Sequence, residues 1–228
     1  MKVGKIMKNL YKEVLSKVNK GESNMSIVID GNVGVGKSTI MELLEKEGYT
    51  AFPEPVVNNP ILDKFYYNRT RWSFPLQIFF LNERFKHIKN CMKLGEHTVQ
   101  DRSIYGDVIF AKMLCDSGEM TEEEFELYKD LLENMLHHIT PPKLMVYLEV
   151  STDEAMKRIK RRGRDYEQIV EREYWDKLNE EYRAYFEGYN ISPILKINVD
   201  NLNYADNEED KQYILKLIAD KLAEIEGV

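Results

Sequence analysis

The sequence predicts an α/β fold of three layers, in which a central parallel sheet of five strands lies between layers of helices. Five short apolar runs alternate with longer stretches of helical periodicity, which is the order that parallel βαβ units require. The first apolar run leads through a glycine-rich segment straight into a helical pattern. A length of 228 residues suits one domain with a full core. We therefore expect one domain over residues 25–228, with an extension over residues 1–24 before it.

The extension differs in composition from the rest of the chain. It is rich in lysine, and apolar residues such as Ile6 and Leu10 follow a near-helical spacing. An organelle-targeting segment would be rich in arginine and poor in acids, whereas this one has no arginine and contains Glu13 and Glu22. A surface helix or a frayed tail is the preferred interpretation, and targeting is the alternative.

The first predicted strand, Ser26–Asp30, runs into a glycine-rich segment and then a helix over Thr39–Lys46, which Gly48 ends. The segment reads G-x-x-x-x-G-K-S between a strand and a helix, which is the pattern of a phosphate-binding P-loop. Glycines let backbone N–H groups turn toward an anion, and the helix N-terminus adds positive potential. We expect Lys37 to reach the β- and γ-phosphates of a nucleoside triphosphate and Ser38 to hold Mg²⁺. The predicted phosphate-binding residues are Gly31, Asn32, Gly34, Gly36, Lys37, Ser38 and Thr39.

The second predicted strand, Tyr49–Pro53, ends beside Glu54. Pro53 and Pro55 fix an extended backbone on both sides, which gives the carboxylate a defined direction. Ligands of parallel sheets gather at the carboxyl ends of the strands, so Glu54 is a candidate to take a proton from a hydroxyl that attacks the γ-phosphate. A solvated loop glutamate is the alternative.

A long helix is predicted over Trp72–Lys93, with Pro75 tolerated only in the first turn. Gln77 and Arg84 lie two turns apart on one face of it. A glutamine amide suits the edge of a nucleobase, but polar and aromatic residues at this spacing also suit a core, and the pattern leaves both interpretations open.

The third predicted strand, Thr98–Asp101, ends in Asp101-Arg102-Ser103. In P-loop enzymes an aspartate at the end of a neighbouring strand supports Mg²⁺, and Arg102 can pair with phosphate or orient a carboxylate. A structural ion pair is the alternative. Helices are expected over Ile104–Asp116 and over Thr121–Ile139, the second beginning with a capping box.

The fourth predicted strand, Leu144–Val150, leads into a helix over Thr152–Arg162 that ends in basic residues. Such a cluster can be a solvated face or a nucleic-acid patch. A mobile lid whose arginines close over a transferring phosphoryl group explains it better, because arginine stays charged and binds phosphate through two N–H groups. The cluster consists of Arg158, Lys160, Arg161, Arg162 and Arg164 around Gly163. The remaining predicted elements are a helix over Glu173–Glu187, a strand over Ile194–Val199 and a helix over Glu208–Ile225.

Composition narrows the function. The net charge of −7 argues against a general nucleic-acid binder. Cys91 and Cys115 lack the spacing of a metal or redox site, so we expect reduced thiols in a cytoplasmic protein. No apolar run has the length of a membrane span and no secretory signal is visible, so no membrane partner is expected.

Taken together, these motifs resemble the deoxynucleoside kinases, a family of P-loop kinases, from about Met25 to the C-terminus. The resemblance lies in Gly31–Thr39, Phe52–Val56, Arg71–Phe74 with Gln77, Asp101–Tyr105, Pro141–Leu148 and Arg162–Glu167. It implies transfer of the γ-phosphoryl group of ATP, with Mg²⁺, to the 5′-hydroxyl of a deoxynucleoside. It also implies a homodimer packed through helices.

The resemblance assigns roles to particular residues. Glu54 matches the base that deprotonates the 5′-hydroxyl, and Arg102 matches the arginine beside the 5′ position. Together with Lys37 of the P-loop they are the predicted catalytic residues. Gln77 matches the residue that pairs with the nucleobase, and Tyr66 and Glu167 match the pair that holds the 3′-hydroxyl. Arg158, Arg162 and Arg164 match the lid arginines on the donor side. Asp200 falls near the loop that frames the donor adenine, and Ser38 and Asp101 are the expected Mg²⁺ ligands.

The choice of nucleobase depends on Arg84 and Asp107, which match a charged pair of the deoxycytidine and purine kinases. A thymine methyl group would meet a desolvated ion pair there, so thymidine should be a poor substrate. Phe80 and Asp101 resemble bacterial purine-type enzymes. We expect deoxyadenosine or deoxyguanosine as substrate, with deoxycytidine as the alternative.

Two other functions remain to be weighed. A non-catalytic nucleotide-binding subunit could keep the fold and lose its catalytic residues, but Lys37, Ser38, Glu54 and Arg102 are all present. A nucleoside monophosphate kinase would need further positive charge for the acceptor phosphate, whereas Gln77, Tyr66 and Glu167 suit an acceptor with an uncharged sugar.

Overall fold

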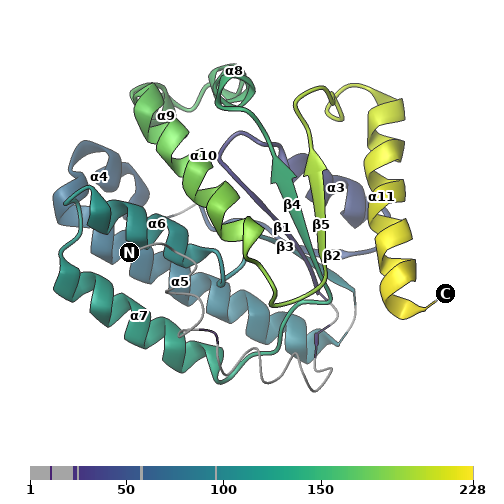
Figure 1. Ribbon diagram of the computed structural model, residues 1–228, viewed down its shortest axis with the longest axis horizontal. Helices are drawn as coiled ribbons and strands as arrows, with labels where there is room; N and C mark the ends of the chain where they lie inside the picture. Colours follow the sequence, from purple (N-terminus) through teal and green to yellow (C-terminus); the bar gives the residue numbers. More distant parts are fainter. Residues whose placement is uncertain (1–10, 12–22, 25, 57–58, 96, 228) are drawn as a thin grey trace.

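A parallel sheet of five strands forms the centre of the molecule (Figure 1). The computed structural model describes residues 11, 23–24, 26–56, 59–95 and 97–227. The strand order is β2-β3-β1-β4-β5, and every pairing is parallel, as the sequence predicted. The strands are β1 (Ser26–Gly31), β2 (Thr50–Phe52), β3 (Thr98–Asp101), β4 (Leu144–Glu149) and β5 (Ile194–Asn198).

Helices connect the strands. In chain order they are α3 (Lys37–Lys46), α4 (Leu62–Tyr67), α5 (Arg69–Leu94), α6 (Asp107–Asp116), α7 (Glu122–Leu136), α8 (Thr152–Arg162), α9 (Asp165–Gln168), α10 (Arg172–Glu187) and α11 (Glu208–Glu226). Of these, α4 and α9 were not predicted, because helices of four to six residues are too short to show a periodicity.

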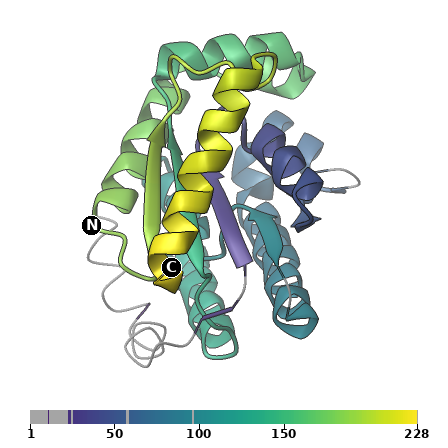
Figure 2. The ribbon, with the colours of Figure 1, turned by 90° about the vertical axis from the view of Figure 1, so that its right-hand side faces the viewer.

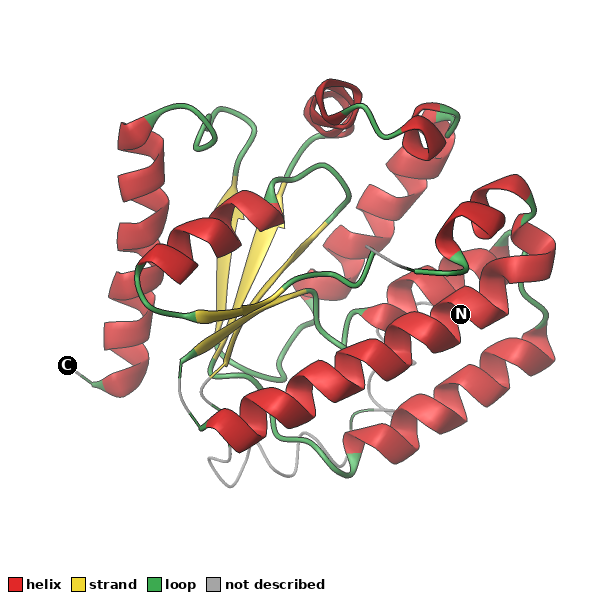
Figure 3. Cartoon of the chain, turned by 180° about the vertical axis from the view of Figure 1, so that it is seen from behind, coloured by secondary structure: helices red, strands yellow, loops and turns green. Residues whose placement is uncertain are grey.

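The alternation of side chains along β1 explains the three layers. Ile27 and Ile29 point to one face, where they pack in a cluster that includes residues of α3 and α11. Val28 points to the other face and packs in a larger cluster with α5, α6, α7 and α10. Because successive side chains of a strand face opposite ways, one strand supplies both cores. Figure 2 shows α11 in front of the sheet, and Figure 3 shows helices on both sides of the strands.

The start of α5 differs from the prediction. The helix begins at Arg69, and the Asn68 side chain caps it by accepting a hydrogen bond of 3.1 Å from the Arg71 N–H. Pro75 therefore lies inside the helix and not in its first turn. An interior proline costs about 3 kcal/mol, and the burial of Leu76 and Leu81 on the same helix offsets it.

Two local signals are confirmed, and the start of α6 also differs from the prediction. Thr121 and Glu124 form the predicted capping box at the start of α7. Gly48 ends α3 with a φ of 91°. The helix expected from Ile104 begins only at Asp107, because Ser103 closes a turn first by accepting a hydrogen bond from the Gly106 N–H.

The residues before β1 contribute to the core at one described position. Tyr11 is 1% exposed, and its hydroxyl donates a hydrogen bond of 2.5 Å to the carbonyl of Tyr105. The Tyr185 hydroxyl donates to the same carbonyl. The rest of the predicted surface helix or tail, residues 1–10 and 12–22, lies outside the described residues.

Candidate active site

The glycine-rich segment between β1 and α3 is packed so closely that Gly34 and Gly36 leave no room for a side chain. Gly34 has a φ of 79°, and a Cβ there would lie 2.8 Å from the carbonyl oxygen of Ala155 in α8. Gly36 has a φ of 98°, and its Cβ would lie 2.3 Å from the Tyr204 hydroxyl. Only glycine adopts these conformations without strain. The loop is therefore held open as a cradle of backbone N–H groups at the start of α3.

Lys37 is buried and folded back over this loop. Its ammonium group donates to the carbonyls of Gly31 and Asn32 and lies 3.9 Å from Asp101 Oδ1. Burial, and after it the positive charge of Arg102, lowers the pKa of Lys37 to about 8. Because the Lys37 ammonium is buried and its ion pair with Asp101 is long, it is suited to bind an anion such as a phosphate group.

Asp101 reaches the same place from the end of β3, which pairs with β1 through Ile29. Burial raises the pKa of Asp101 to about 6, and Lys37 offsets part of that rise. Among the described residues, Asp101 Oδ1 is buried and accepts no hydrogen bond. Ser38 is exposed to the cavity in front of it.

These oxygens fit a magnesium ion. Mg²⁺ binds hard oxygen ligands and usually keeps one or two protein ligands beside phosphates and water. Within the described part of the chain, no cluster of three or more His, Cys, Asp or Glu side chains could hold a metal alone. The hydroxyl of Ser38 and the carboxylate of Asp101 would hold the ion together with phosphate oxygens.

Glu54 lies beyond the end of β2 and is held by two arginines. Its Oε1 accepts hydrogen bonds of 2.8 Å from Arg102 Nε and 3.0 Å from Arg84 Nη2. Burial alone would raise the pKa of this carboxyl, but Arg102, Arg84 and then Lys37 outweigh it and lower the pKa to about 2. The side chain is 23% exposed. Glu54 is therefore an ionised, oriented carboxylate with one open side.

Arg102 links Glu54 to the glycine-rich loop. Its Nη1 donates to the Gly31 carbonyl at 2.8 Å and to the Tyr182 hydroxyl. Its φ of 66° is the only positive φ of a non-glycine residue among those described. Such strain persists only where surrounding contacts fix the residue, and it is common at functional sites.

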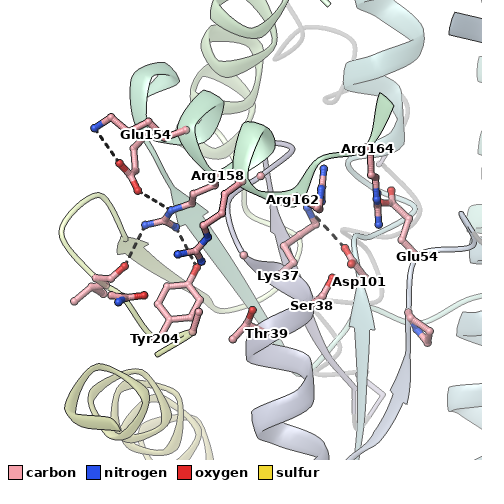
Figure 4. Close-up of a pocket in the computed structure, with 18 of the residues that line it drawn as sticks. Lys37, Ser38, Thr39, Glu54, Asp101, Glu154, Arg158, Arg162, Arg164 and Tyr204 are labelled. Atoms are coloured by element: carbon pink, nitrogen blue, oxygen red, sulfur yellow. Dashed lines mark hydrogen bonds and ion pairs between the residues drawn. The ribbon is translucent and has the colours of Figure 1, made fainter. Parts of the chain in front are cut away.

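A cavity of about 940 Å³ opens over the loop. Figure 4 shows Lys37, Ser38, Asp101 and Glu54 around it, with Arg162 and Arg164 above. Of the predicted phosphate-binding residues, those that line it are Gly34, Gly36, Lys37, Ser38, Thr39, Arg158, Arg162, Arg164 and Asp200. The Asn32 side chain instead turns away, donating to Asn179 Oδ1 at 3.3 Å.

A second cavity, of about 90 Å³, lies beyond Glu54. It is lined by the residues predicted to bind an acceptor, namely Tyr66, Gln77, Arg84, Arg102 and Glu167. Glu54 and Lys37 line both cavities, as do Arg162 and Arg164. The carboxylate of Glu54 therefore stands at the junction between a phosphate-binding cavity and a partly apolar one.

The arginines of the predicted lid fall into two kinds. Arg162 pairs with both oxygens of Glu167, at 2.6 Å each, and Arg164 lies 3.4 Å from the same carboxylate. Gly163 stands between them with a φ of 73°. Arg158 instead donates to the backbone carbonyls of Val35, Val199 and Leu202. Arg158 therefore connects the glycine-rich loop with the segment that follows β5. Arg162 and Arg164 instead form ion pairs with one side chain, Glu167.

Arg84 and Asp107 form the predicted ion pair, but only Arg84 lines the second cavity. Asp107 lies behind it on α6 and is 3% exposed. Within the described residues, Arg84 Nε and Asp107 Oδ2 have no hydrogen-bond partner. Asp107 therefore acts on the cavity through the position of Arg84.

Several residues of the site were not predicted. Phe110 and Tyr174 line the second cavity, and the Tyr204 hydroxyl donates to the Val35 carbonyl in the glycine-rich loop. From α10, Asn179 contacts Asn32 of that loop and Tyr182 contacts Arg102. In the sequence Phe110, Tyr174, Asn179 and Tyr182 look like ordinary residues of amphipathic helices, and Tyr204 falls in the connection before the last predicted helix. The one available signal is Asn179, a polar residue at a buried position of α10.

Comparison with known proteins agrees with this geometry. The chain matches the family model "Deoxynucleoside kinase" over residues 27–223. A deoxyadenosine/deoxycytidine kinase of Bacillus subtilis (strain 168) is 40% identical over 202 residues, which cover 86% of this chain and 92% of that protein. A deoxyguanosine kinase of Lactobacillus johnsonii is 39% identical over 209 residues, 87% of this chain and 93% of that one.

A similar solved structure is that of the deoxyadenosine kinase from M. mycoides with bound dATP. It superposes with a TM-score of 0.77 at 32% identity and covers 86% of this chain and 100% of that one. Within the described residues no helix has the length and apolarity of a membrane span. The chain therefore belongs to the deoxynucleoside kinase family, as its motifs predicted, and it is a phosphotransferase with a nucleotide donor and a nucleoside acceptor.

Proposed function

We propose that this protein transfers the γ-phosphoryl group of ATP to the 5′-hydroxyl of a purine deoxynucleoside. The observation that carries the proposal is the position of Glu54. Its ionised carboxylate stands where the phosphate-binding cavity meets the smaller one. A sugar in the smaller cavity would present its primary alcohol to Glu54, and the γ-phosphate would approach from the other side.

On the donor side, the backbone of Gly34 and Gly36 with Lys37 would bind the β- and γ-phosphates. Mg²⁺, held by Ser38 and Asp101, would neutralise charge on those phosphates. The 5′-oxygen attacks the γ-phosphorus, the bond to the β–γ bridging oxygen breaks, and ADP leaves. The hydroxyl proton passes to Glu54. Since the pKa of Glu54 is about 2 in the free protein, the carboxylate orients the alcohol first and takes the proton late in the transfer.

The lid arginines would stabilise the charge that spreads over the transferred group. Arg162 and Arg164 line both cavities and here bind Glu167, which is 4% exposed. When the 3′-hydroxyl of a sugar reaches Glu167 and phosphates reach the arginines, these ion pairs are exchanged for ligand contacts. Binding of both substrates would then order the lid.

The proposed nucleobase preference follows from two polar side chains that line the second cavity, Gln77 and Arg84. Gln77 is 6% exposed and can present its amide to a nucleobase, and Arg84 adds hydrogen-bond donors beside it. The relatives named deoxyadenosine/deoxycytidine kinase and deoxyguanosine kinase support a purine acceptor. A thymine methyl group would lie against the Arg84 cation, which is 4% exposed, and could offer it no hydrogen bond.

The direct test is an assay with Mg·ATP and each of the four deoxynucleosides. The proposal expects 5′-monophosphates of deoxyadenosine or deoxyguanosine as the main products and little product from thymidine. Binding of nucleotide without turnover of any nucleoside would favour a non-catalytic subunit. Turnover of monophosphates alone would favour a nucleoside monophosphate kinase.

We also propose a homodimer in the cytoplasm. Exposed apolar side chains on α5 and α7, including Leu94 at 47% and Leu127 at 62%, are of the kind that a helix-packed dimer buries. Cys91 and Cys115 are free thiols, which suits a reducing compartment. Light scattering of the purified protein and of a Leu127→Glu variant tests the dimer.

A further inference from the structure

Tyr182 lies on helix α10 and lines neither cavity. It nevertheless contacts Arg102, the arginine that donates a hydrogen bond to Glu54. The Tyr182 hydroxyl accepts a hydrogen bond from Arg102 Nη1, which also donates to the Gly31 carbonyl. Arg102 Nε donates to Glu54 at 2.8 Å. The chain of contacts therefore runs from α10 through one guanidinium to the proposed base.

Tyr182 is itself held in place. It is 1% exposed, with its ring 6.0 Å from that of Phe110 at 80° and 6.2 Å from that of Phe186 at 22°. Phe186 in turn stacks on Tyr147 of β4, with 4.0 Å between ring centroids. Because the ring has aromatic contacts and no exposed edge, its hydroxyl keeps a fixed position relative to the sheet.

Helix α10 is also fastened to the glycine-rich loop one turn away from Tyr182. Asn179 accepts a hydrogen bond from the Asn32 side chain and donates to the Val150 carbonyl at 2.8 Å, after the end of β4. Both residues are buried. The loop and Arg102 are therefore positioned by the same helix, through Asn179 and Tyr182 respectively.

Arg102 needs such support. Its positive φ places the backbone in a region that residues with a Cβ rarely adopt. Its side chain is 4% exposed, so every unpaired N–H there is costly. Its forked geometry lets separate N–H groups bind Glu54, Gly31 and Tyr182 at once.

We propose that Tyr182 is a positioning residue for phosphoryl transfer: its hydroxyl fixes the orientation of Arg102, and through it the direction of the Glu54 carboxylate. This inference rests on the proposed role of Glu54 as the base. It predicts that loss of the hydroxyl lowers kcat and leaves nucleoside binding in place, because Tyr182 lines neither cavity and its hydroxyl contacts Arg102.

The experiment compares Tyr182→Phe with Tyr185→Phe. Both residues lie on α10, both are essentially unexposed, and both lose one buried hydroxyl with its hydrogen bond. The Tyr185 hydroxyl, however, binds the Tyr105 carbonyl and not Arg102. Thermal unfolding of the two variants measures the structural cost of a lost hydroxyl, and kcat and KM for the nucleoside are measured where both are folded.

We expect kcat of Tyr182→Phe to fall roughly tenfold with the nucleoside KM within about twofold, as for the loss of one hydrogen bond to a charged group. We expect Tyr185→Phe to keep kcat within about twofold. Equal kcat values for the two variants, or a rise in KM alone for Tyr182→Phe, would overturn the proposal. So would failure of Tyr182→Phe to fold where Tyr185→Phe folds, since the hydroxyl would then serve stability.

A double-mutant cycle with Arg102→Lys adds a readout that a structural role would not move. Lysine lacks the fork that reaches Tyr182 and Glu54 together. In the Arg102→Lys background, Tyr182→Phe should lower kcat by no more than about twofold, whereas independent effects would multiply. If Glu54→Gln keeps full turnover, the proposed function itself fails. If Glu54→Gln loses turnover and Tyr182→Phe does not, only the positioning role fails.

Discussion

Arg84 donates one hydrogen bond of 3.0 Å to Glu54 through Nη2 and pairs with Asp107 through Nη1. One guanidinium therefore connects the carboxylate of Glu54, at the junction of the two cavities, with the buried carboxylate of Asp107. Under the proposed function, Arg84 takes part in both nucleobase specificity and catalysis. A change at Asp107 should affect both.

Asp107→Ala tests this connection. Without the Asp107 carboxylate, the guanidinium of Arg84 can move away from the nucleobase end of the cavity. That movement leaves room for a thymine methyl group. We expect kcat/KM for thymidine to rise about tenfold, and kcat for purines to fall, because Arg84 no longer holds Glu54 in one direction. Steady-state kinetics with four nucleosides measures both. Asp107→Asn, which keeps the volume and one acceptor, is the control; an unchanged thymidine rate in Asp107→Ala would contradict the specificity argument.

Glu54→Gln should abolish most of the turnover and little of the binding. The amide keeps the shape of the side chain but cannot take a proton, and it presents an N–H to Arg84 and Arg102. We expect kcat to fall by about 10³-fold, within the range for loss of a general base. Calorimetric titration with the deoxynucleoside should give a Kd within a few-fold of that of the unchanged protein. Turnover close to the original value would show that another group accepts the proton.

Asp101→Asn tests how the Asp101 carboxylate affects both the stability of the folded protein and its requirement for Mg²⁺. The folded-state pKa of Asp101 is raised from 3.8 to about 6, so its ionisation destabilises the folded protein above pH 6. That destabilisation vanishes below about pH 4, where Asp101 is protonated in both states. The rise corresponds to at most about 3 kcal/mol. We expect Asp101→Asn to unfold at a higher temperature at pH 7.5, with the difference shrinking toward pH 4, while the Mg²⁺ concentration for half-maximal rate increases.

A lower or equal melting temperature for Asp101→Asn at pH 7.5 would mean that the Lys37 ion pair outweighs the burial of the carboxylate. Asp220→Asn is the control, because Asp220 is exposed on α11 and lines neither cavity.

Tyr11 tests whether the segment before the kinase domain supports the fold. Tyr11→Ala removes a buried ring beside Tyr105 and should lower the free energy of unfolding by about 3 kcal/mol. Tyr11→Phe removes only the hydrogen bond to the Tyr105 carbonyl and should cost about 1 kcal/mol. Urea unfolding measures both. Tyr213→Ala, at a residue 51% exposed, should change little. Equal stability of Tyr11→Ala and the unchanged protein would place Tyr11 outside the core.

The sequence predicted the parts of the site that are continuous in the chain. The segment from Gly31 to Ser38 could be recognised because a tight anion-binding loop needs glycine at particular positions and must join a strand to a helix. Glu54 and Asp101 could be placed because parallel strands end at the same edge of a sheet. The helix start at Arg69 was missed, because Pro75 suggested a later start and the cap at Asn68 was not recognised.

What the sequence by itself determined is the fold, the nucleotide-binding loop and the family, since these follow from local conformational requirements and from the alternation of strands and helices. Only the tertiary structure decided that Arg158 binds backbone carbonyls while Arg162 and Arg164 pair with Glu167, that Asp107 lies behind Arg84, and that Tyr182 supports Arg102. These are contacts between side chains far apart in the chain. Their geometry depends on how the helices pack on the sheet, and no periodicity within a single segment records it.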